Sequence, residues 1–450
     1  PLDTEFGRKR KINQSSCNQD YSCVDGFCPS FVTIEGAENA QATALPALTA
    51  EATPLPEFAP LEGVRNIVFT GIGGTGVTTT ASILAMAAHV DGRAASVMDM
   101  TGLAQKGGAV FSHVRIGRDE DVVVGGRTPA ASAHVLVACD ILSAAGADAL
   151  SLYAKDRTAA FANQDFAPTA DFVTDRDVKF DSGLMGRKIA AATRSFEECP
   201  AHHLAETRFG DAIYANMIML GFAWQTGQIP VSSRALYRAI RLNGVAADAN
   251  LQAFELGRQV AHDPSKRGEP EVHGPTPETM ELDALIAHRT AELTAYQDAA
   301  YAGRYRRQVD RAAEAGSDAF TRAVAVNLYK LMAYKDEYEV ARLYVDGRFS
   351  AAREATFKGG RSKVWLAPPI LAPKDSKGRP RKIAFGGWML DYGFPLLARL
   401  KGLRGTPFDL FGGHPERRLE RRLIADYEAG LDRLMGRLAG TGASPEQSAL

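Results

Sequence analysis

One glycine-rich turn constrains the fold of this chain more than any other feature. Residues 71–76 read Gly-Ile-Gly-Gly-Thr-Gly, and they stand between an apolar run at 66–70 and a helical pattern at 77–90. Glycines permit a tight turn from strand to helix, and the unpaired N–H groups at a helix start favour an anion such as a phosphate. This predicts an α/β fold whose candidate phosphate-binding residues are Gly71, Gly73, Gly74, Thr75 and Gly76.

Further strand and helix patterns follow the turn along the chain. Three apolar segments predict buried strands and two amphipathic segments predict helices, at residues 94–98, 109–116, 134–139, 211–224 and 233–243. Apolar strands that alternate with helices are typical of a sheet that helices cover on both faces. We therefore predict a Rossmann-like, mostly parallel sheet with flanking helices over residues 63–262.

The composition changes on both sides of this domain. Residues 1–40 form a polar, Cys-bearing segment, and residues 41–62 are rich in Ala, Thr and Pro, which is typical of an extended linker. Three long helical patterns come later in the chain, at residues 279–315, 318–333 and 415–438. They predict a mainly helical C-terminal domain over residues 275–450.

The bulk composition limits the classes of function. The formal net charge of -1 gives no overall field that would attract nucleic acid or an anionic membrane. The longest apolar runs are far shorter than the roughly 20 residues that span a bilayer. Because the chain starts at Pro1 without an apolar signal segment, we predict a cytoplasmic fragment whose N-terminus lies upstream, with no nucleic-acid or membrane partner.

A second glycine-rich segment precedes the predicted strand at 109–116. Its candidate ligand-binding residues are Gln105, Lys106, Gly107, Gly108 and, within the strand, Arg115. Paired glycines beside a cation and an amide are suited to a loop over an anionic or carbonyl-bearing ligand. The alternative is a tight loop followed by a strand from which His113 and Arg115 point outward.

An acidic residue leaves two interpretations of the first turn open. Asp99 stands after the predicted strand at 94–98, near the distance at which a dinucleotide fold places the acid that binds ribose. This favours NAD or FAD. In the alternative, the glycines only let the helix pack closely on the strand, and Asp99 caps a loop.

Three cysteines indicate a metal site near the N-terminus. Cys17, Cys23 and Cys28 lie within twelve residues, and Pro29 follows the last of them. Thiolates this close are suited to an iron–sulfur cluster, and zinc or free thiols are the alternatives. The spacings differ from those of ferredoxins, and a 4Fe-4S cluster would take its fourth ligand from elsewhere.

The two glycine-rich segments together resemble a known family. Residues 66–115 resemble the gamma domain of the 2-oxoacid:ferredoxin oxidoreductases, and the Ser-His-Val-Arg run at 112–115 is most similar to the indolepyruvate branch. This resemblance extends over residues 63 to about 260. The junction at 7–33 and the C-terminal runs at 334–344 and 404–412 are similar to the long fused members of the family, so we expect the chain to be their C-terminal part.

The resemblance implies a reaction. Such an enzyme decarboxylates a 2-oxoacid, here indolepyruvate or another aryl pyruvate, and forms an arylacetyl-CoA while electrons pass through iron–sulfur clusters to ferredoxin. Thiamine diphosphate and Mg are expected in upstream domains of the same polypeptide, so the fragment alone is expected to be inactive. The family usually assembles as a homo-oligomer.

The resemblance also implies roles for the candidate residues. The first turn would hold CoA, with charge supplied by Lys106 and Arg115, and the three N-terminal cysteines would ligate iron. Two alternatives remain: an NAD- or FAD-dependent dehydrogenase that uses the same glycines, and a non-catalytic assembly module in which the glycines serve only packing.

Overall fold

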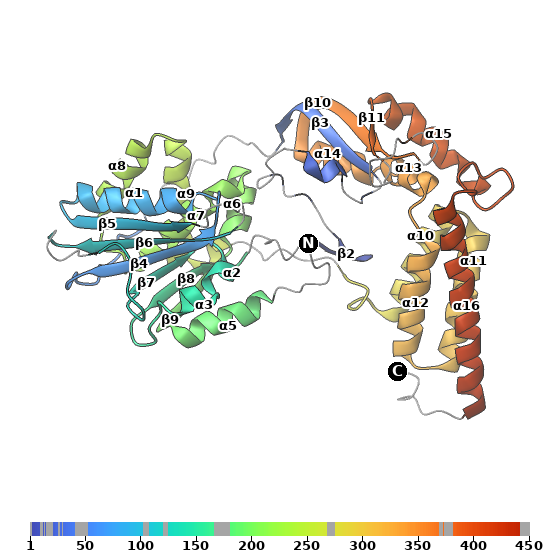
Figure 1. The fold of residues 1–450 in the computed structure, drawn as a ribbon, viewed down its shortest axis with the longest axis horizontal. Helices are drawn as coiled ribbons and strands as arrows, with labels where there is room; N and C mark the ends of the chain where they lie inside the picture. Colours follow the sequence, from blue (N-terminus) through green and yellow to red (C-terminus); the bar gives the residue numbers. More distant parts are fainter. Residues whose placement is uncertain are drawn as a thin grey trace. The chain divides into compact units, whose positions relative to one another are not determined.

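The chain folds into two compact units. The computed structural model (Figure 1) describes residues 2–9, 12, 14, 21–25, 28, 30–40, 53–101, 108–119, 125–165, 181–267, 275–368, 372 and 381–441. The α/β unit comprises Gln14–Ser16 and Gln41–Val272. The C-terminal unit comprises Pro1–Asn13, Cys17–Ala40 and His273–Leu450.

A sheet forms the centre of the α/β unit. In the described part of the chain its strands follow the order β5-β6-β4-β7-β8-β9. They are β4 (Arg65–Ile72), β5 (Ala94–Thr101), β6 (Ala109–Gly117), β7 (Val135–Ala138), β8 (Ala159–Asn163) and β9 (Ser195–Cys199). The pairs β4–β7, β7–β8 and β8–β9 are parallel, whereas β6 runs antiparallel to both β4 and β5. The predicted mostly parallel sheet is confirmed, with one inverted strand.

The inverted strand follows from a short connection. Residues 102–108 join β5 to β6, and a parallel crossover needs about a dozen residues or more. The two strands therefore run in opposite directions. This places the start of β6, rather than its end, beside the end of β4, where Ala109 pairs with Ile72.

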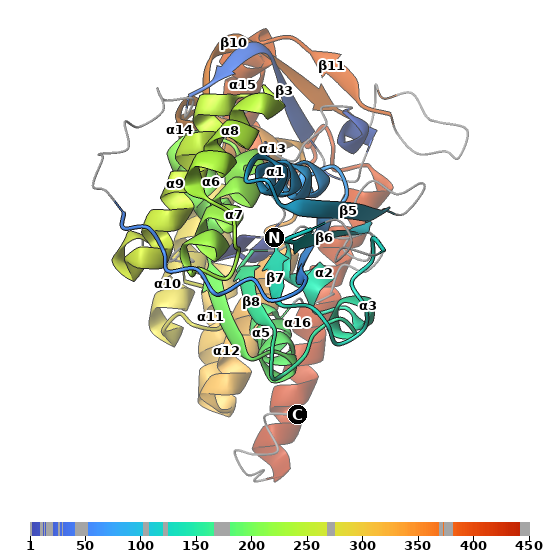
Figure 2. The same cartoon turned by 90° about the vertical axis from the view of Figure 1, so that its left-hand side faces the viewer.

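Helices cover both faces of the sheet, as predicted (Figure 1, Figure 2). One face carries α1 (Val77–Val90), α6 (Ala201–Phe209), α7 (Ala215–Gln225), α8 (Ser233–Asn243) and α9 (Ala247–His262). The other carries α2 (Ile141–Ala144), α3 (Ala147–Leu150) and α5 (Ser182–Ala192). Successive side chains of β4 enter different layers, because strand side chains alternate. Ile67 and Phe69 pack with the first set of helices, and Val68 packs with the second.

Local signals set the bounds of two helices. Helices α1 and α8 begin and end at the predicted residues. The Ser232 hydroxyl accepts a hydrogen bond from the Ala235 N–H and caps α8, and Gly244 ends it in the left-handed conformation with φ 74°. The helix expected over 211–224 is a short 3-10 turn, η3 (Ala212–Tyr214), followed by α7.

The C-terminal unit is mainly helical, as predicted. Its helices are α10 (Leu282–Tyr296), α11 (Ala299–Ala315), α12 (Asp318–Met332), α13 (Glu337–Val345), α14 (Arg348–Thr356), α15 (Phe394–Arg399) and α16 (Pro415–Thr441). The single helix expected over 279–315 is wrong, because Asp298 caps a new helix by accepting a hydrogen bond from the Tyr301 N–H at 2.8 Å.

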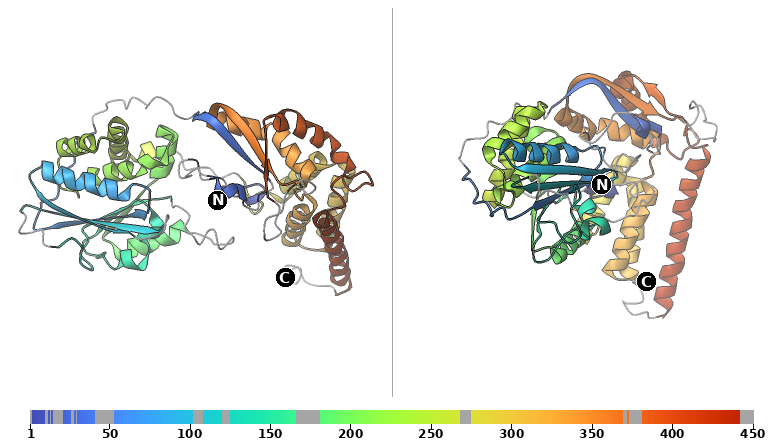
Figure 3. Two further views of the ribbon diagram at one scale, coloured as in Figure 1. Left: turned by 45° about the horizontal axis from the view of Figure 1, so that its top comes forward. Right: turned by 60° about the vertical axis from the view of Figure 1, so that its left-hand side comes forward.

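The N-terminal segment belongs to the C-terminal unit. Strand β3 (Ser30–Asn39) pairs antiparallel with β10 (Phe357–Leu366), which also pairs with β11 (Ile383–Phe385), as Figure 3 shows. A short hairpin of β1 (Leu2–Thr4) and β2 (Gly7–Lys9) precedes them. Across the described helices, none is both long and apolar enough to cross a lipid bilayer.

Candidate functional site

The glycines of the turn between β4 and α1 have different structural tasks. A Cβ on Gly71 would lie 2.5 Å from Val77 Cγ2, so this glycine is required for close packing of helix on strand. Gly74 and Gly76 both have φ of 89°, in the left-handed region that favours glycine. A Cβ on Gly74 would meet no atom of the described residues within 4 Å. Packing therefore accounts for Gly71 but not for Gly74, which faces open space.

Hydrogen bonds hold the turn in place. Gly73 N–H donates to the Gly108 carbonyl at 2.9 Å, which brings the two predicted glycine segments together. The Thr75 hydroxyl donates to the Ile72 carbonyl at 2.8 Å. The buried side-chain amide of Asn216, on α7, donates to the Thr75 carbonyl at 2.7 Å. Sequence reasoning missed Asn216, because its partner lies far away along the chain.

The start of α1 keeps its backbone donors available. No side chain caps the helix at Gly76, and its first turn contains no acidic residue. The first N–H groups of a helix have no partner within the helix, and the dipole there is positive. An exposed, rigid turn of this kind can bind a phosphate or diphosphate through its backbone.

The second glycine segment is described only at its end. Gln105, Lys106 and Gly107 lie outside the described residues, whereas Gly108 lies beside the turn. Arg115 lies toward the opposite end of β6, where it pairs with Asn66 at the start of β4. Its Nε donates to Asn66 Oδ1 at 3.0 Å, and its Nη1 donates to the Gly125 carbonyl. The structure does not bring Arg115 to the turn, because β6 is inverted.

The outward position expected for His113 is wrong. Its side chain is buried on β6, and Nδ1 accepts a hydrogen bond from the Thr128 N–H at 3.4 Å. Burial lowers the pKa of His113, and the charge of Arg127 lowers it further. The neutral imidazole is thus part of the interior of the sheet layer and not of a surface loop.

Asp99 is not placed as a dinucleotide site requires. It lies within β5, and its carboxylate accepts a hydrogen bond from the Ser112 hydroxyl at 2.5 Å. Strand β6 separates β5 from β4, so β5 is not the neighbour of the strand that carries the glycine turn. A Rossmann dinucleotide site takes its ribose-binding acid from that neighbouring strand. This arrangement counts against NAD or FAD.

The cysteines fall into two classes. Cys23, in the 3-10 turn η1 (Ser22–Asp25), and Cys28 are exposed, while Cys17 lies outside the described residues. Burial raises the pKa of Cys139 and of Cys199 to about 12, so neither forms the thiolate that a metal needs. Among the described residues, no group of three or more His, Cys, Asp or Glu side chains is placed to hold a metal ion.

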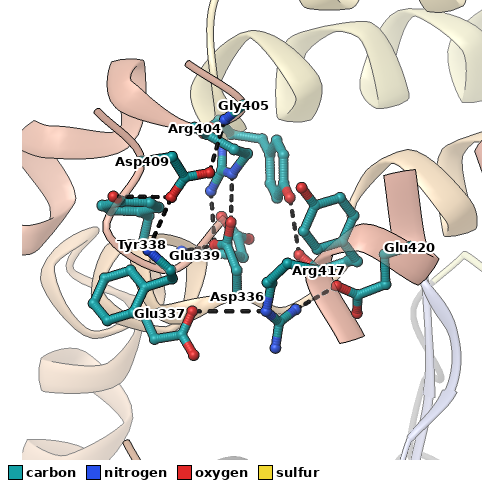
Figure 4. Close-up of polar contacts among 12 residues, drawn as sticks. Asp336, Glu337, Tyr338, Glu339, Arg404, Gly405, Asp409, Arg417 and Glu420 are labelled. Carbon is teal, nitrogen blue, oxygen red and sulfur yellow. Dashed lines mark hydrogen bonds and ion pairs between the residues drawn. The ribbon is translucent and has the colours of Figure 1, made fainter. Parts of the chain in front are cut away.

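A polar cluster in the C-terminal unit, drawn in Figure 4, has a structural role. The Asp336 carboxylate caps α13 by accepting a hydrogen bond from the Glu339 N–H, and it also pairs with Arg404 at 2.5 Å and 2.8 Å. The remaining Arg404 nitrogen donates to the Tyr296 carbonyl at 2.8 Å. Because both charged groups are buried and their hydrogen bonds are satisfied, the pair joins three segments and offers no free group for chemistry.

Comparisons with known proteins identify the α/β unit. Residues 66–260 match the family described as pyruvate ferredoxin/flavodoxin oxidoreductase. The chain is 30% identical over 204 residues to indolepyruvate oxidoreductase subunit IorB of Pyrococcus horikoshii, which covers 44% of this chain and 95% of that subunit. This chain belongs to the 2-oxoacid:ferredoxin oxidoreductases. The resemblance of the α/β unit to the gamma domain of this family is confirmed.

One further subunit and one solved structure match the same share of this oxidoreductase chain. Subunit IorB of Thermococcus kodakarensis is 30% identical over 207 residues, 44% of this chain and 95% of that subunit. The crystal structure of pyruvate oxidoreductase subunit PORC from Thermotoga maritima is 20% identical with a TM-score of 0.34, and covers 44% of this chain and 97% of that one. Residues 282–445 match a family of unknown function.

Proposed function

We propose that this chain is part of an indolepyruvate:ferredoxin oxidoreductase of the long fused type. The reaction would convert an aryl pyruvate and CoA into an arylacetyl-CoA and carbon dioxide, with two electrons passed to ferredoxin. The observation that carries the proposal is the match to IorB, because it extends over nearly the whole of that subunit. Thiamine diphosphate with Mg, bound by other domains of the enzyme, would supply the decarboxylation chemistry.

The turn at the start of α1 is the proposed CoA site. Its backbone N–H groups and the helix dipole would bind the diphosphate of CoA, and Gly74 leaves open space for it. The hydrogen bonds from Asn216 to Thr75 and from Gly73 to Gly108 would keep the donors oriented. Gly108 lies beside the turn, so the residues that precede it in the sequence stay candidates for the same site: Gln105, Lys106 and Gly107. Arg115 no longer supports it, because it lies at the far end of β6.

Cys17, Cys23 and Cys28 are the proposed ligands of an iron–sulfur cluster. The described members, Cys23 and Cys28, are exposed, so a metal can reach their sulfur atoms, unlike those of the buried Cys139 and Cys199. A cluster held there would relay single electrons toward ferredoxin. A further ligand would come from a partner domain.

The test uses the whole enzyme, assembled anaerobically with its thiamine-binding part. We expect ferredoxin reduction that depends on indolepyruvate, CoA and thiamine diphosphate, and we expect bound iron and acid-labile sulfide. Cys23→Ser should lower the iron content. An enzyme that reduces NAD and leaves ferredoxin oxidised would contradict the proposal and restore the dehydrogenase alternative.

A matched pair of variants tests the CoA site. Gly74→Asp places a carboxylate over the start of α1, and Gly92→Asp places one just beyond its other end. Both glycines have positive φ, 89° and 71°, and neither has an atom within 4 Å of an added Cβ, so the strain is similar. Repulsion of the diphosphate should raise the KM for CoA about tenfold or more in Gly74→Asp. Equal KM values in the two variants would exclude the turn as the CoA site. The alternative of a non-catalytic assembly module, in which the glycines serve only packing, would then be favoured.

A further inference from the structure

Arg289, on α10 of the C-terminal unit, is a buried cation that forms no ion pair with any described carboxylate. Its side chain is 2% exposed and lies between two aromatic rings, 4.8 Å from the ring centre of Phe6 and 4.4 Å from that of Tyr329. One Arg289 nitrogen donates to the Glu5 carbonyl, but Nε and Nη1 have no hydrogen-bond partner. Buried charges are normally paired, and the cation–π contacts recover only part of the cost of burial.

Arg289 and two lysines act electrostatically on a third lysine, Lys9. Partial desolvation lowers the pKa of Lys9, which lies on β2 with an exposed side chain, and the charges of Lys335, Arg289 and Lys330 lower it further. These four residues, here called the cation cluster, come from β2, α10, α12 and the segment before α13. Like charges repel each other, and among the described residues no carboxylate is one of the charges that act on Lys9.

The carboxylates that act on the neighbouring Tyr329 do not supply this counter-charge. They are Glu292 and Glu339, and both accept hydrogen bonds from Arg342, at 3.2 Å and 2.8 Å. In the described part of the chain, no carboxylate forms an ion pair with Arg289. The adjacent His288 also has a buried Nδ1 without a hydrogen-bond partner.

We propose that the cation cluster binds a phosphate-bearing anion, with a diphosphate as the best match. Four cations need more than one negative charge, and phosphate oxygens accept hydrogen bonds from guanidinium and ammonium groups at once. Arg289 forms the base of the site, and the exposed Lys9, Lys330 and Lys335 form its rim. The site lies in the C-terminal unit and is independent of the glycine turn.

Binding at this site should stabilise the N-terminal hairpin. Glu5 and Phe6 form the turn between β1 and β2, and they contact Arg289 directly. Lys9 belongs to the same hairpin. A bound diphosphate would therefore hold the hairpin against α10 and α12, which slows hydrogen exchange of the hairpin amides.

The test is a calorimetric titration of the full chain with inorganic pyrophosphate at constant ionic strength. Because the glycine turn is itself a proposed diphosphate site, the titration is made in the Gly74→Asp background, where we expect saturable binding at one site and slower amide exchange in residues 2–9. The double variant Lys330→Gln/Lys335→Gln should weaken binding about tenfold or more, since it removes two charge-assisted contacts. Lys358→Gln is the control, because Lys358 is exposed on β10 of the same unit and is not among the charges acting on Lys9.

Comparison of the variants decides the outcome. Binding that survives the Lys330→Gln/Lys335→Gln change, or that Lys358→Gln weakens equally, overturns the proposal, as does the absence of saturable heat. Arg289→Gln should also abolish binding, but the exposed lysine variants keep the test valid if that variant fails to fold. Pyrophosphate binding that remains in the Gly74→Asp background separates this site from the proposed CoA site. Tighter binding of ADP than of pyrophosphate would identify a nucleotide as the source of the diphosphate.

Discussion

Helices α7 and α9 of the α/β unit meet through two glycines. In the C-terminal unit, by contrast, Arg404 links two helix ends, through a buried ion pair with Asp336 at the start of α13 and a hydrogen bond to the Tyr296 carbonyl at the end of α10. A Cβ on Gly221 would lie 2.0 Å from the Phe254 carbonyl oxygen, and one on Gly257 would lie 2.0 Å from that of Ile218. At the Asp336–Arg404 pair the contact is made by side chains, with Arg404 Nε 2.5 Å from Asp336 Oδ2.

This difference shows how each unit depends on single residues. In the α/β unit the close packing of α7 on α9 requires that Gly221 has no side chain, because any side chain there would push the two backbones apart. In the C-terminal unit the contact requires both side chains of the Asp336–Arg404 pair, because each buried polar group needs its partner. The first unit should therefore be sensitive to added volume, and the second to removed hydrogen-bonding groups.

Removing one partner of the buried ion pair should have the largest effect. Arg404→Met leaves the Asp336 carboxylate buried and unpaired, which should destabilise the C-terminal unit by about 3–5 kcal/mol. Hydrogen exchange of α10 and α13 measures the loss within this unit. The control is Arg306→Met, whose ion pair with Asp310 is half exposed and should contribute less than about 0.5 kcal/mol. Equal losses would mean that the buried pair has no special role.

Adding one methyl group should break the contact between α7 and α9. Gly221→Ala forces the two helix backbones apart and should destabilise the α/β unit by about 1–3 kcal/mol. Gly436→Ala is the matched control, because Gly436 lies exposed on α16 and an added Cβ meets no atom within 4 Å. The control should gain up to about 1 kcal/mol through helix propensity. In thermal unfolding, a loss of stability in Gly221→Ala with a gain in Gly436→Ala would support this account of the α7–α9 contact. An unchanged stability of Gly221→Ala would refute it.

The sequence predicted features that depend on neighbouring residues. Helices α1 and α8 begin and end where expected, because glycines and a Ser cap mark their ends locally. The break at Asp298 is also a local signal, and giving weight to this capping residue would have found it.

Features that depend on long-range pairing were not predictable. If β6 ran parallel to β4, its last residues would lie near the glycine turn and Arg115 would belong to the site. The inversion puts Gly108 there instead. In the same way, the pairing of β3 with β10 joins segments about three hundred residues apart, and no periodicity encodes it.

The smallest expected effect is a loss of stability of the α/β unit, but not of the C-terminal unit, at low pH. The Asn66 N–H donates to His134 Nδ1 at 3.1 Å, which requires the neutral imidazole. Burial, with the charges of Arg65 and Arg157, lowers the pKa of His134 from 6.5 to about 4. Because the folded state binds this proton more weakly, the contribution is complete above pH 6.5 and is lost as the pH falls toward 4. His134→Gln should flatten this slope in hydrogen exchange of β4 and β7, while exchange in α10 should be unaffected. An unchanged slope would mean that other groups control the acid sensitivity of the unit.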